Sequence, residues 1–205
     1  MLDKLVVLRE RTIYHVAGTR PAAYYIADRE AGGVLVNAPP FDPALLAALN
    51  GCAALQYLFL PSRRGARDLD RWRAAAGLET IAGEVEAPRI AGTIDLAVGG
   101  RRKLTRTIDF LPMSGVTEGS CTLRIKNDGG VIFFGPILEP GPDGWPALVP
   151  HPDDCSTENR LIGALGLQDQ RFEYAFTDVF EPGRTRFGPG AGAAVREGLR
   201  NVMGD

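Results

Sequence analysis

The stretch Leu55-Gln56-Tyr57-Leu58-Phe59-Leu60 is an apolar run that leads directly into the loop Pro61-Ser62-Arg63-Arg64-Gly65-Ala66-Arg67. A largely apolar run of this length predicts a strand that is covered on both faces of its sheet. Val34–Val36 predicts an earlier strand. Asp42-Pro43 predicts the start of a helix between the two strands, because Asp caps free amides and Pro suits the first helical position. The order strand, helix, strand and loop predicts a mixed α and β architecture.

Local patterns extend this reading over the rest of the chain. Short β-branched or aromatic runs predict further strands at Leu5–Leu8, Thr12–Val16, Ala22–Ile26, Glu79–Ala82, Thr93–Val98, Thr107–Leu111, Cys121–Lys126, Val131–Phe134 and Phe172–Phe180. Turn and capping residues predict a helix that ends at Gly51 and further helices at Asp68–Ala76, Ser156–Leu165 and Ala193–Val202. Glycine-rich turns predict hairpins at Glu30–Gly33 and Asn127–Gly130. We expect the α+β class, as a four-layer αββα sandwich of two mixed β-sheets flanked by helices.

Composition narrows the class of protein. The 205 residues carry 23 basic and 25 acidic side chains, for a net charge of −2, and a general nucleic-acid binder would show a basic excess. Three scattered cysteines do not make a disulfide scaffold, and no apolar run approaches the ~20 residues of a membrane helix. No signal-peptide pattern follows Met1. We expect a soluble cytoplasmic protein that binds neither nucleic acid nor membrane.

Five segments, taken in order, resemble the metallo-β-lactamase superfamily. They are Gly33–Pro40 with the helix after it, Leu55–Leu60, Phe110–Ser120, Val131–Pro136 and Phe180–Thr185. The resemblance implies a single metallo-β-lactamase-like domain over residues 1–205. It also implies a dinuclear metal centre held mainly by histidines, on a Thr-His-x-His-x-Asp-His loop that falls on Pro61–Arg67.

This chain departs from the family at the metal ligands. The corresponding positions carry Ser62, Arg64, Ala66, Arg67, Val116, Pro136 and Arg184, and Asn37 stands where an aspartate is usual. Arginine stays protonated and has no lone pair for a metal, and the whole chain has two histidines, His15 and His151. We therefore expect no metal, no cofactor, no catalytic residue and none of the family's metal-dependent hydrolase activity.

The arginines suggest another use of the same cleft. If the family fold holds, we expect an anion-binding site formed by Ser62, Arg63, Arg64, Arg67, Ser114, Thr117 and Arg184, because planar guanidinium groups suit carboxylate or phosphate. The alternative is that the arginines pair with Asp68, Asp70, Glu118 or Asp178 and fill the site with salt bridges.

Three functions stay open on the sequence. The first is a non-catalytic binding or interaction module for a small anionic ligand. The second is a metal-independent, hydrolase-like enzyme that acts on a small anionic substrate through the same cleft. The third is a subunit that pairs with a protein partner or with a second copy of the chain.

Other reactive residues have simpler explanations. His151-Pro-Asp-Asp-Cys155 is expected to be a surface loop, and His15 to lie half-buried or facing solvent on a strand. Cys52 and Cys121 are expected to be buried structural thiols, and Gly188–Gly192 a turn before the last helix. Trp72 and Trp145 are expected to pack in the core or to cover a loop.

Overall fold

The computed structural model describes residues 1–167 and 169–204. The chain divides into two compact units, of which the first is Met1–Gly99 and the second begins at Gly100. Each unit contains one large mixed β-sheet with two α-helices, so the α+β class is confirmed. That residues 1–205 form a single domain stays a prediction.

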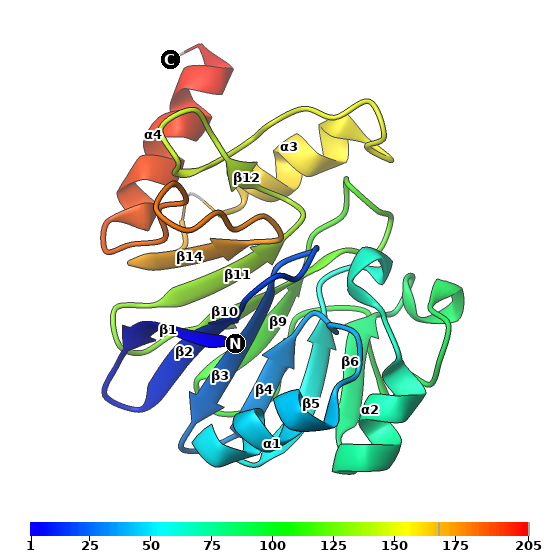
Figure 1. Ribbon diagram of the computed structural model, residues 1–205. Helices are drawn as coiled ribbons and strands as arrows, with labels where there is room; N and C mark the ends of the chain where they lie inside the picture. The colour runs from blue at the N-terminus through cyan, green and yellow to red at the C-terminus, as the bar shows by residue number, and fades with distance from the viewer. Residues whose placement is uncertain (168, 205) are drawn as a thin grey trace. The chain divides into compact units, whose positions relative to one another are not determined.

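The first unit contains a seven-stranded sheet whose strands lie in sequence order (Figure 1). The strands are β1 (Leu2–Val7), β2 (Arg11–Val16), β3 (Ala23–Asp28), β4 (Gly32–Val36), β5 (Leu55–Leu60), β6 (Glu79–Gly83) and β7 (Leu96–Val98). Strands β1 to β4 pair antiparallel, and β4 to β7 pair parallel. The helices are α1 (Pro43–Cys52) and α2 (Leu69–Ala76), with short 3-10 turns η1 (Arg63–Gly65) and η2 (Ala87–Arg89).

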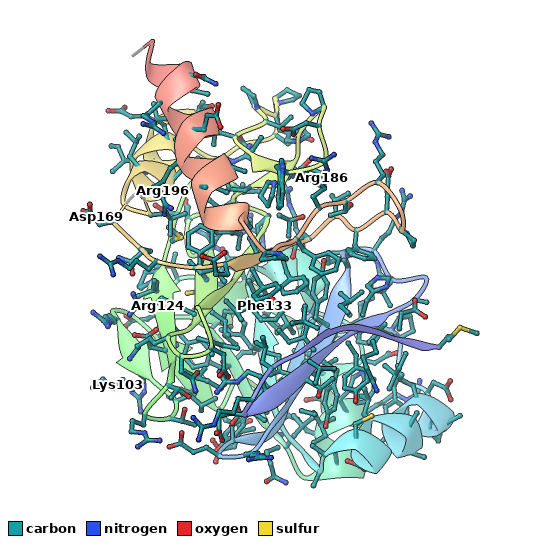
Figure 2. All side chains as sticks on the ribbon, turned by 90° about the vertical axis from the view of Figure 1, so that its left-hand side faces the viewer. Lys103, Arg124, Phe133, Asp169, Arg186 and Arg196 are labelled. Atoms are coloured by element: carbon teal, nitrogen blue, oxygen red, sulfur yellow. The ribbon has the colours of Figure 1, made fainter. Side chains whose placement is uncertain are left out.

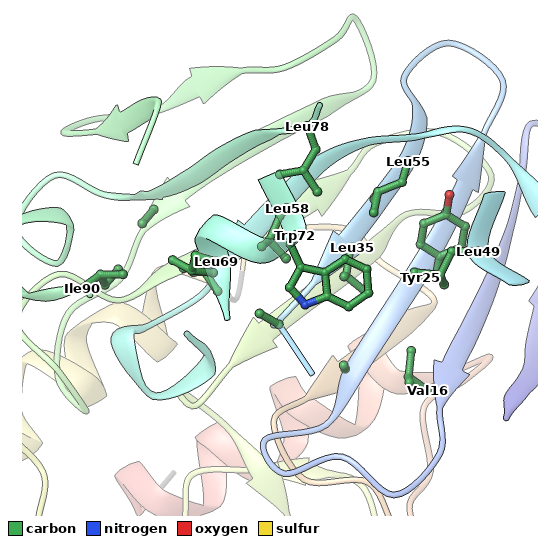
Figure 3. Close-up of a cluster of buried hydrophobic side chains, with 14 residues drawn as sticks. Val16, Tyr25, Leu35, Leu49, Leu55, Leu58, Leu69, Trp72, Leu78 and Ile90 are labelled. Atoms are coloured by element: carbon green, nitrogen blue, oxygen red, sulfur yellow. The ribbon is translucent and has the colours of Figure 1, made fainter. Parts of the chain in front are cut away.

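Buried apolar side chains hold α1 and α2 against this sheet. Trp72 of α2 is fully buried among leucines that include Leu35 and Leu58 (Figure 3). Its indole Nε1 donates to the carbonyl of Pro39 at 2.9 Å, and its ring meets Phe41 edge to face at 5.1 Å. The indole is thus buried with its one polar atom satisfied, which fixes α2 next to the segment after β4.

The second unit contains a five-stranded sheet in the order β14-β11-β10-β9-β8. Its strands are β8 (Arg102–Lys103), β9 (Ile108–Pro112), β10 (Cys121–Ile125), β11 (Val131–Gly135) and β14 (Tyr174–Thr177), and β12 (Glu139–Pro140) pairs with β13 (Pro146–Ala147). Only β11 and β14 pair parallel among these described strands. Helices α3 (Thr157–Leu165) and α4 (Ala191–Met203) bury apolar residues against Ile132 and Phe134 of β11.

Several local predictions are confirmed and others are wrong at their boundaries. Asp42 caps α1 with Pro43 in its first turn, and the 127–130 turn has the positive φ angles that its glycines allow. Gly51 does not end α1, which continues to Cys52, because one helical glycine costs only about 1 kcal/mol relative to alanine. The predicted strand Phe172–Phe180 is limited to Tyr174–Thr177. Within the described residues, none of the helices has both the length and the apolar character needed to cross a bilayer.

Candidate functional site

The loop after β5 is held by hydrogen bonds of the Ser62 hydroxyl and of the Gly65 carbonyl. Ser62 is fully buried, and its hydroxyl oxygen accepts a hydrogen bond from the Arg64 amide at 3.3 Å at the start of η1. The carbonyl of Gly65 accepts from the Ala38 amide at 2.8 Å. The Pro61–Arg67 loop is therefore bonded to the segment that follows β4, as well as being continuous with β5.

Asn37 packs against Gly65 of this loop. The residue is buried, has a left-handed φ of 62°, and donates from Nδ2 to the carbonyl of Ala22 at 2.8 Å. A Cβ placed on Gly65 would lie 1.9 Å from Asn37 Oδ1. Only glycine therefore fits at position 65 while Asn37 keeps its place.

The three arginines of the loop have different surroundings. Arg63 pairs with the fully buried carboxylate of Glu86, through its backbone amide at 2.9 Å and through Nη1 at 3.3 Å. Arg67 donates from Nη2 to the carbonyl of Arg20 at 2.8 Å. The exposed side chain of Arg64 has no hydrogen-bond or ion-pair partner within residues 1–167 and 169–204.

These contacts correct the expected salt-bridge partners of Arg63. Its acid is Glu86, which sequence reasoning missed because the glutamate lies 23 residues away in a segment without a recognisable motif. Asp68 instead accepts from the Phe41 amide at 2.9 Å and lies 3.9 Å from Arg71. Asp70 accepts from the Thr93 amide at 3.2 Å.

The residues of the second unit that the sequence assigned to the metal-ligand positions or to the anion-binding site lie in three loops. Ser114, Val116 and Thr117 lie between β9 and β10, where Val116 is buried in the apolar cluster under α3 and α4. The Thr117 hydroxyl is buried and lies 2.6 Å from that of Ser120, so it already has a hydrogen-bond partner. Arg184, in the loop after β14, pairs with Glu181 at 3.2 Å, and its side chain is 70% exposed.

Pro136 is held by a buried cation that the sequence did not single out. Arg160 of α3 is fully buried and donates to the carbonyls of Pro136 at 3.4 Å, Ile137 at 2.8 Å and Val149 at 2.6 Å. It also pairs with Asp154 at 2.8 Å. One guanidinium therefore joins the segments on both sides of the β12–β13 hairpin.

Both histidines contact an acidic side chain. His151 Nε2 lies 3.0 Å from Glu139 Oε2 at the surface, as expected for a loop residue. His15 is buried, with Nδ1 3.7 Å from Asp3, so the expected half-buried or solvent-facing position is wrong. Burial lowers the pKa of His15, and the nearby Asp3 carboxylate only partly offsets this.

The cysteines and tryptophans follow the predictions in part. Cys121 is buried as expected, but Cys52, the last residue of α1, is exposed. Trp72 is a core residue, and Trp145 covers the apolar cluster of the second unit with Arg186 above its ring. Gly188–Gly192 forms the turn into α4, as predicted.

Proteins similar to this chain are found by comparing three-dimensional structures and not by comparing sequences. Neither protein-family models nor the sequences of curated proteins give a match to this chain. A metallo-β-lactamase from Pontibacter korlensis superposes with a TM-score of 0.71 at 13% identity, over 98% of this chain and 100% of the neighbour. The chain has the metallo-β-lactamase fold.

Two further neighbours with this fold are similar in extent. The subclass B3 metallo-β-lactamase BJP-1 of Bradyrhizobium japonicum gives a TM-score of 0.66 at 15% identity, over 98% of this chain and 92% of the neighbour. A metallo-β-lactamase of Cronobacter sakazakii, described by a HARLDQ motif, gives 0.68 at 11% identity, over 98% and 96%. At these identities the likeness establishes the metallo-β-lactamase fold.

The residues at the positions predicted to correspond to the family's metal ligands do not fit a metal pair. Zinc takes imidazole nitrogen, thiolate or carboxylate ligands, and arginine, alanine, valine and proline side chains offer none of these. Within residues 1–167 and 169–204, no group of three or more His, Cys, Asp and Glu side chains is placed to hold a metal ion.

Proposed function

We propose that this protein is a metallo-β-lactamase-fold protein without the family's metal centre, and that it acts as a non-catalytic module that binds a small anion at the Pro61–Arg67 loop. Arg64 carries the proposal. Its side chain is exposed and has no partner among the described residues, at a position where the family places a histidine ligand.

The loop geometry supports an anion as the ligand. A guanidinium presents a planar fork that matches two oxygens of a carboxylate or phosphate. The backbone of Arg64 is fixed by Ser62 and by the packing of Gly65 on Asn37. Binding of an anion therefore costs little additional conformational entropy in the loop backbone. Glu86 neutralises Arg63, which leaves the positive charges of Arg64 and Arg67 for an external anion.

One structural neighbour supports an arginine at this place. The letters HARLDQ match the spacing His-x-His-x-Asp-His with an arginine in the third position. Arg64 is likewise the third residue of Ser62–Arg67. An arginine in the family's second histidine position is thus compatible with the fold. That Arg184, Ser114 and Thr117 join the same site stays a prediction.

Binding of simple anions tests the proposal. Inorganic phosphate, sulfate and citrate are titrated by calorimetry into the wild-type protein and into Arg64→Gln, after treatment with a chelator. We expect saturable binding of at least one anion, and an affinity roughly tenfold or more weaker in the variant, because a hydrogen bond to a charged group contributes about 1.5–3 kcal/mol.

Arg9→Gln is the matched control, because Arg9 is 87% exposed and pairs only loosely with Glu10, at 3.5 Å. Its anion affinity should equal that of the wild type. Equal affinities in wild type and Arg64→Gln, or the absence of binding by all three anions, would refute the proposal. Chelator-resistant turnover of an anionic ester that disappears in Arg64→Gln would replace it with the metal-independent enzyme.

A further inference from the structure

The second unit holds a cluster of three cationic side chains around one buried acid. Asp109 of β9 is fully buried, and its Oδ2 atom lies 3.0 Å from Arg101 Nε, 2.8 Å from Arg124 Nη2 and 3.3 Å from Lys126 Nζ. Because all three nitrogens contact the same oxygen, the three cations are necessarily close to one another.

The cluster has more positive than negative charge. Burial favours the neutral form of Asp109, but the hydrogen bonds and charges of Arg124, Arg101 and Lys126 outweigh burial and lower its pKa. The carboxylate is therefore ionised at neutral pH and balances one of the three cations. The Arg101 and Lys126 side chains are 57% and 31% exposed, so part of the excess charge faces solvent.

A fourth cation extends the cluster along the sheet. Lys103 of β8 pairs in register with Asp109, and Asp109 pairs with Arg124 of β10, so the three residues lie in one row on the same face. Lys103 and Arg124 lie along the same side of the view in Figure 2. Lys103 is exposed and makes no hydrogen bond or ion pair within the described parts of the chain.

The surroundings do not cancel this charge. Arg124 donates its remaining Nη1 group to the neutral side chain of Gln170, not to an acid. Asp169 and Glu173 line a neighbouring cavity of about 460 Å³ together with Gln170, Arg171 and Arg196, so the two acids there are matched in number by two cations.

We propose that the surface formed by Arg101, Lys103 and Lys126, beside the largely buried Arg124–Asp109 pair, binds a polyphosphate-type ligand, meaning a compound with two or more linked phosphate groups. Such a ligand places several negative charges within a few ångströms of one another, which matches the close spacing of these cations. Arginine forks and lysine ammonium groups are both common phosphate donors. The large exposed apolar side chains in the described residues include no aromatic ring, so a base-stacking platform for single-stranded nucleic acid is missing there.

Calorimetric titration with inorganic tripolyphosphate at low salt tests this site. We expect saturable binding to the wild-type protein, weakened at least tenfold in Lys103→Gln/Lys126→Gln. Lys103→Gln alone should weaken binding severalfold while the melting temperature stays unchanged, because the Lys103 side chain makes no hydrogen bond or ion pair within the described residues. The affinity should also fall as sodium chloride is raised, since the attraction is between exposed charges.

Two control variants separate this site from other cations. Arg9→Gln removes an exposed cation outside both proposed sites, and Arg64→Gln, which removes the cation of the proposed anion-binding loop, serves as a second background for the titration. Arg9→Gln should bind tripolyphosphate as the wild type does, and the loss caused by Lys103→Gln/Lys126→Gln should be equally large in the Arg64→Gln background, so this site and the loop can fail independently. Absence of saturable binding, unchanged affinity in Lys103→Gln/Lys126→Gln, or tighter binding of a polyglutamate peptide than of tripolyphosphate would overturn the proposal.

Discussion

At the residue scale, the loop that carries Arg64 depends on Gly65 lying against Asn37. An added Cβ would lie 1.9 Å from Asn37 Oδ1 and 2.8 Å from its Cγ, and the amide is held by its bond to Ala22. We predict that Gly65→Ala lowers the free energy of unfolding by about 1–3 kcal/mol, the usual cost of overpacking a buried site. Chemical denaturation measures this change. The Gly65→Ala substitution should also weaken anion binding at the Pro61–Arg67 loop.

Gly51→Ala is the matched control for that substitution. Gly51 lies inside α1, and nothing lies within 4 Å of the Cβ position. Alanine should therefore stabilise the protein, by up to about 1 kcal/mol. Destabilisation by Gly51→Ala, or a neutral Gly65→Ala, would contradict the packing described for these two glycines.

Asp95 links stability to pH in the acid range. The hydrogen bond from Arg73 is the main cause that lowers its pKa to about 2, and Thr80 contributes further bonds. Its unfolded pKa is near 4, so its contribution, at most about 1 kcal/mol because the pair is partly exposed to solvent, is fully present above pH 4 and is lost as the pH falls toward 2. We predict that Asp95→Asn removes this part of the acid sensitivity, measured as unfolding free energy at pH 5 and pH 3. An identical pH dependence in the variant would refute the assignment.

Sequence patterns predicted residues with local partners and missed those with distant ones. Asp42 and Ser156 cap helices that begin one residue later, which their neighbours suffice to predict. The Arg63–Glu86 pair and the packing of Gly65 on Asn37 join residues more than twenty positions apart. Such contacts are set by the pairing of strands and not by any local pattern.

At the element scale, Arg160 connects α3 to the segments around the β12–β13 hairpin. We predict that Arg160→Met lowers the unfolding free energy by about 3–5 kcal/mol, because it leaves the Asp154 charge buried without its partner. Denaturant unfolding measures the loss. Arg184→Gln is the control, since its exposed pair with Glu181 should contribute at most about 1 kcal/mol. Equal effects of the two substitutions would contradict the structural role of Arg160.

Element boundaries could be predicted only where a strong local signal marks them. Pro43 and Gly77 mark the start of α1 and the end of α2, and the structure agrees. The apolar residues around β14 continue on both sides of it, so the predicted strand was too long. Phe172 is buried against Phe134 and Phe180 contacts Phe187, so both apolar rings pack outside the strand without β pairing.

At the scale of the whole molecule, the fold was predictable, whereas the cationic surface around Asp109 was not. The order of the predicted strands and helices indicated two mixed sheets, and structural neighbours at 11–15% identity have the metallo-β-lactamase fold. The net charge of −2 gave no sign of the cationic surface around Asp109, because composition averages over local excesses. The joining of Arg184 to the Arg64 loop stays a prediction.

Metal content tests the central claim most directly. The protein is expressed in zinc-supplemented medium, purified by gel filtration without chelator, and measured by elemental analysis together with its melting temperature in added zinc. The positions predicted to correspond to the family's ligands carry serine, arginine, alanine, valine and proline, so we predict no stoichiometric metal and an unchanged melting temperature. One or two zinc ions per chain that survive gel filtration and raise the melting temperature would contradict it.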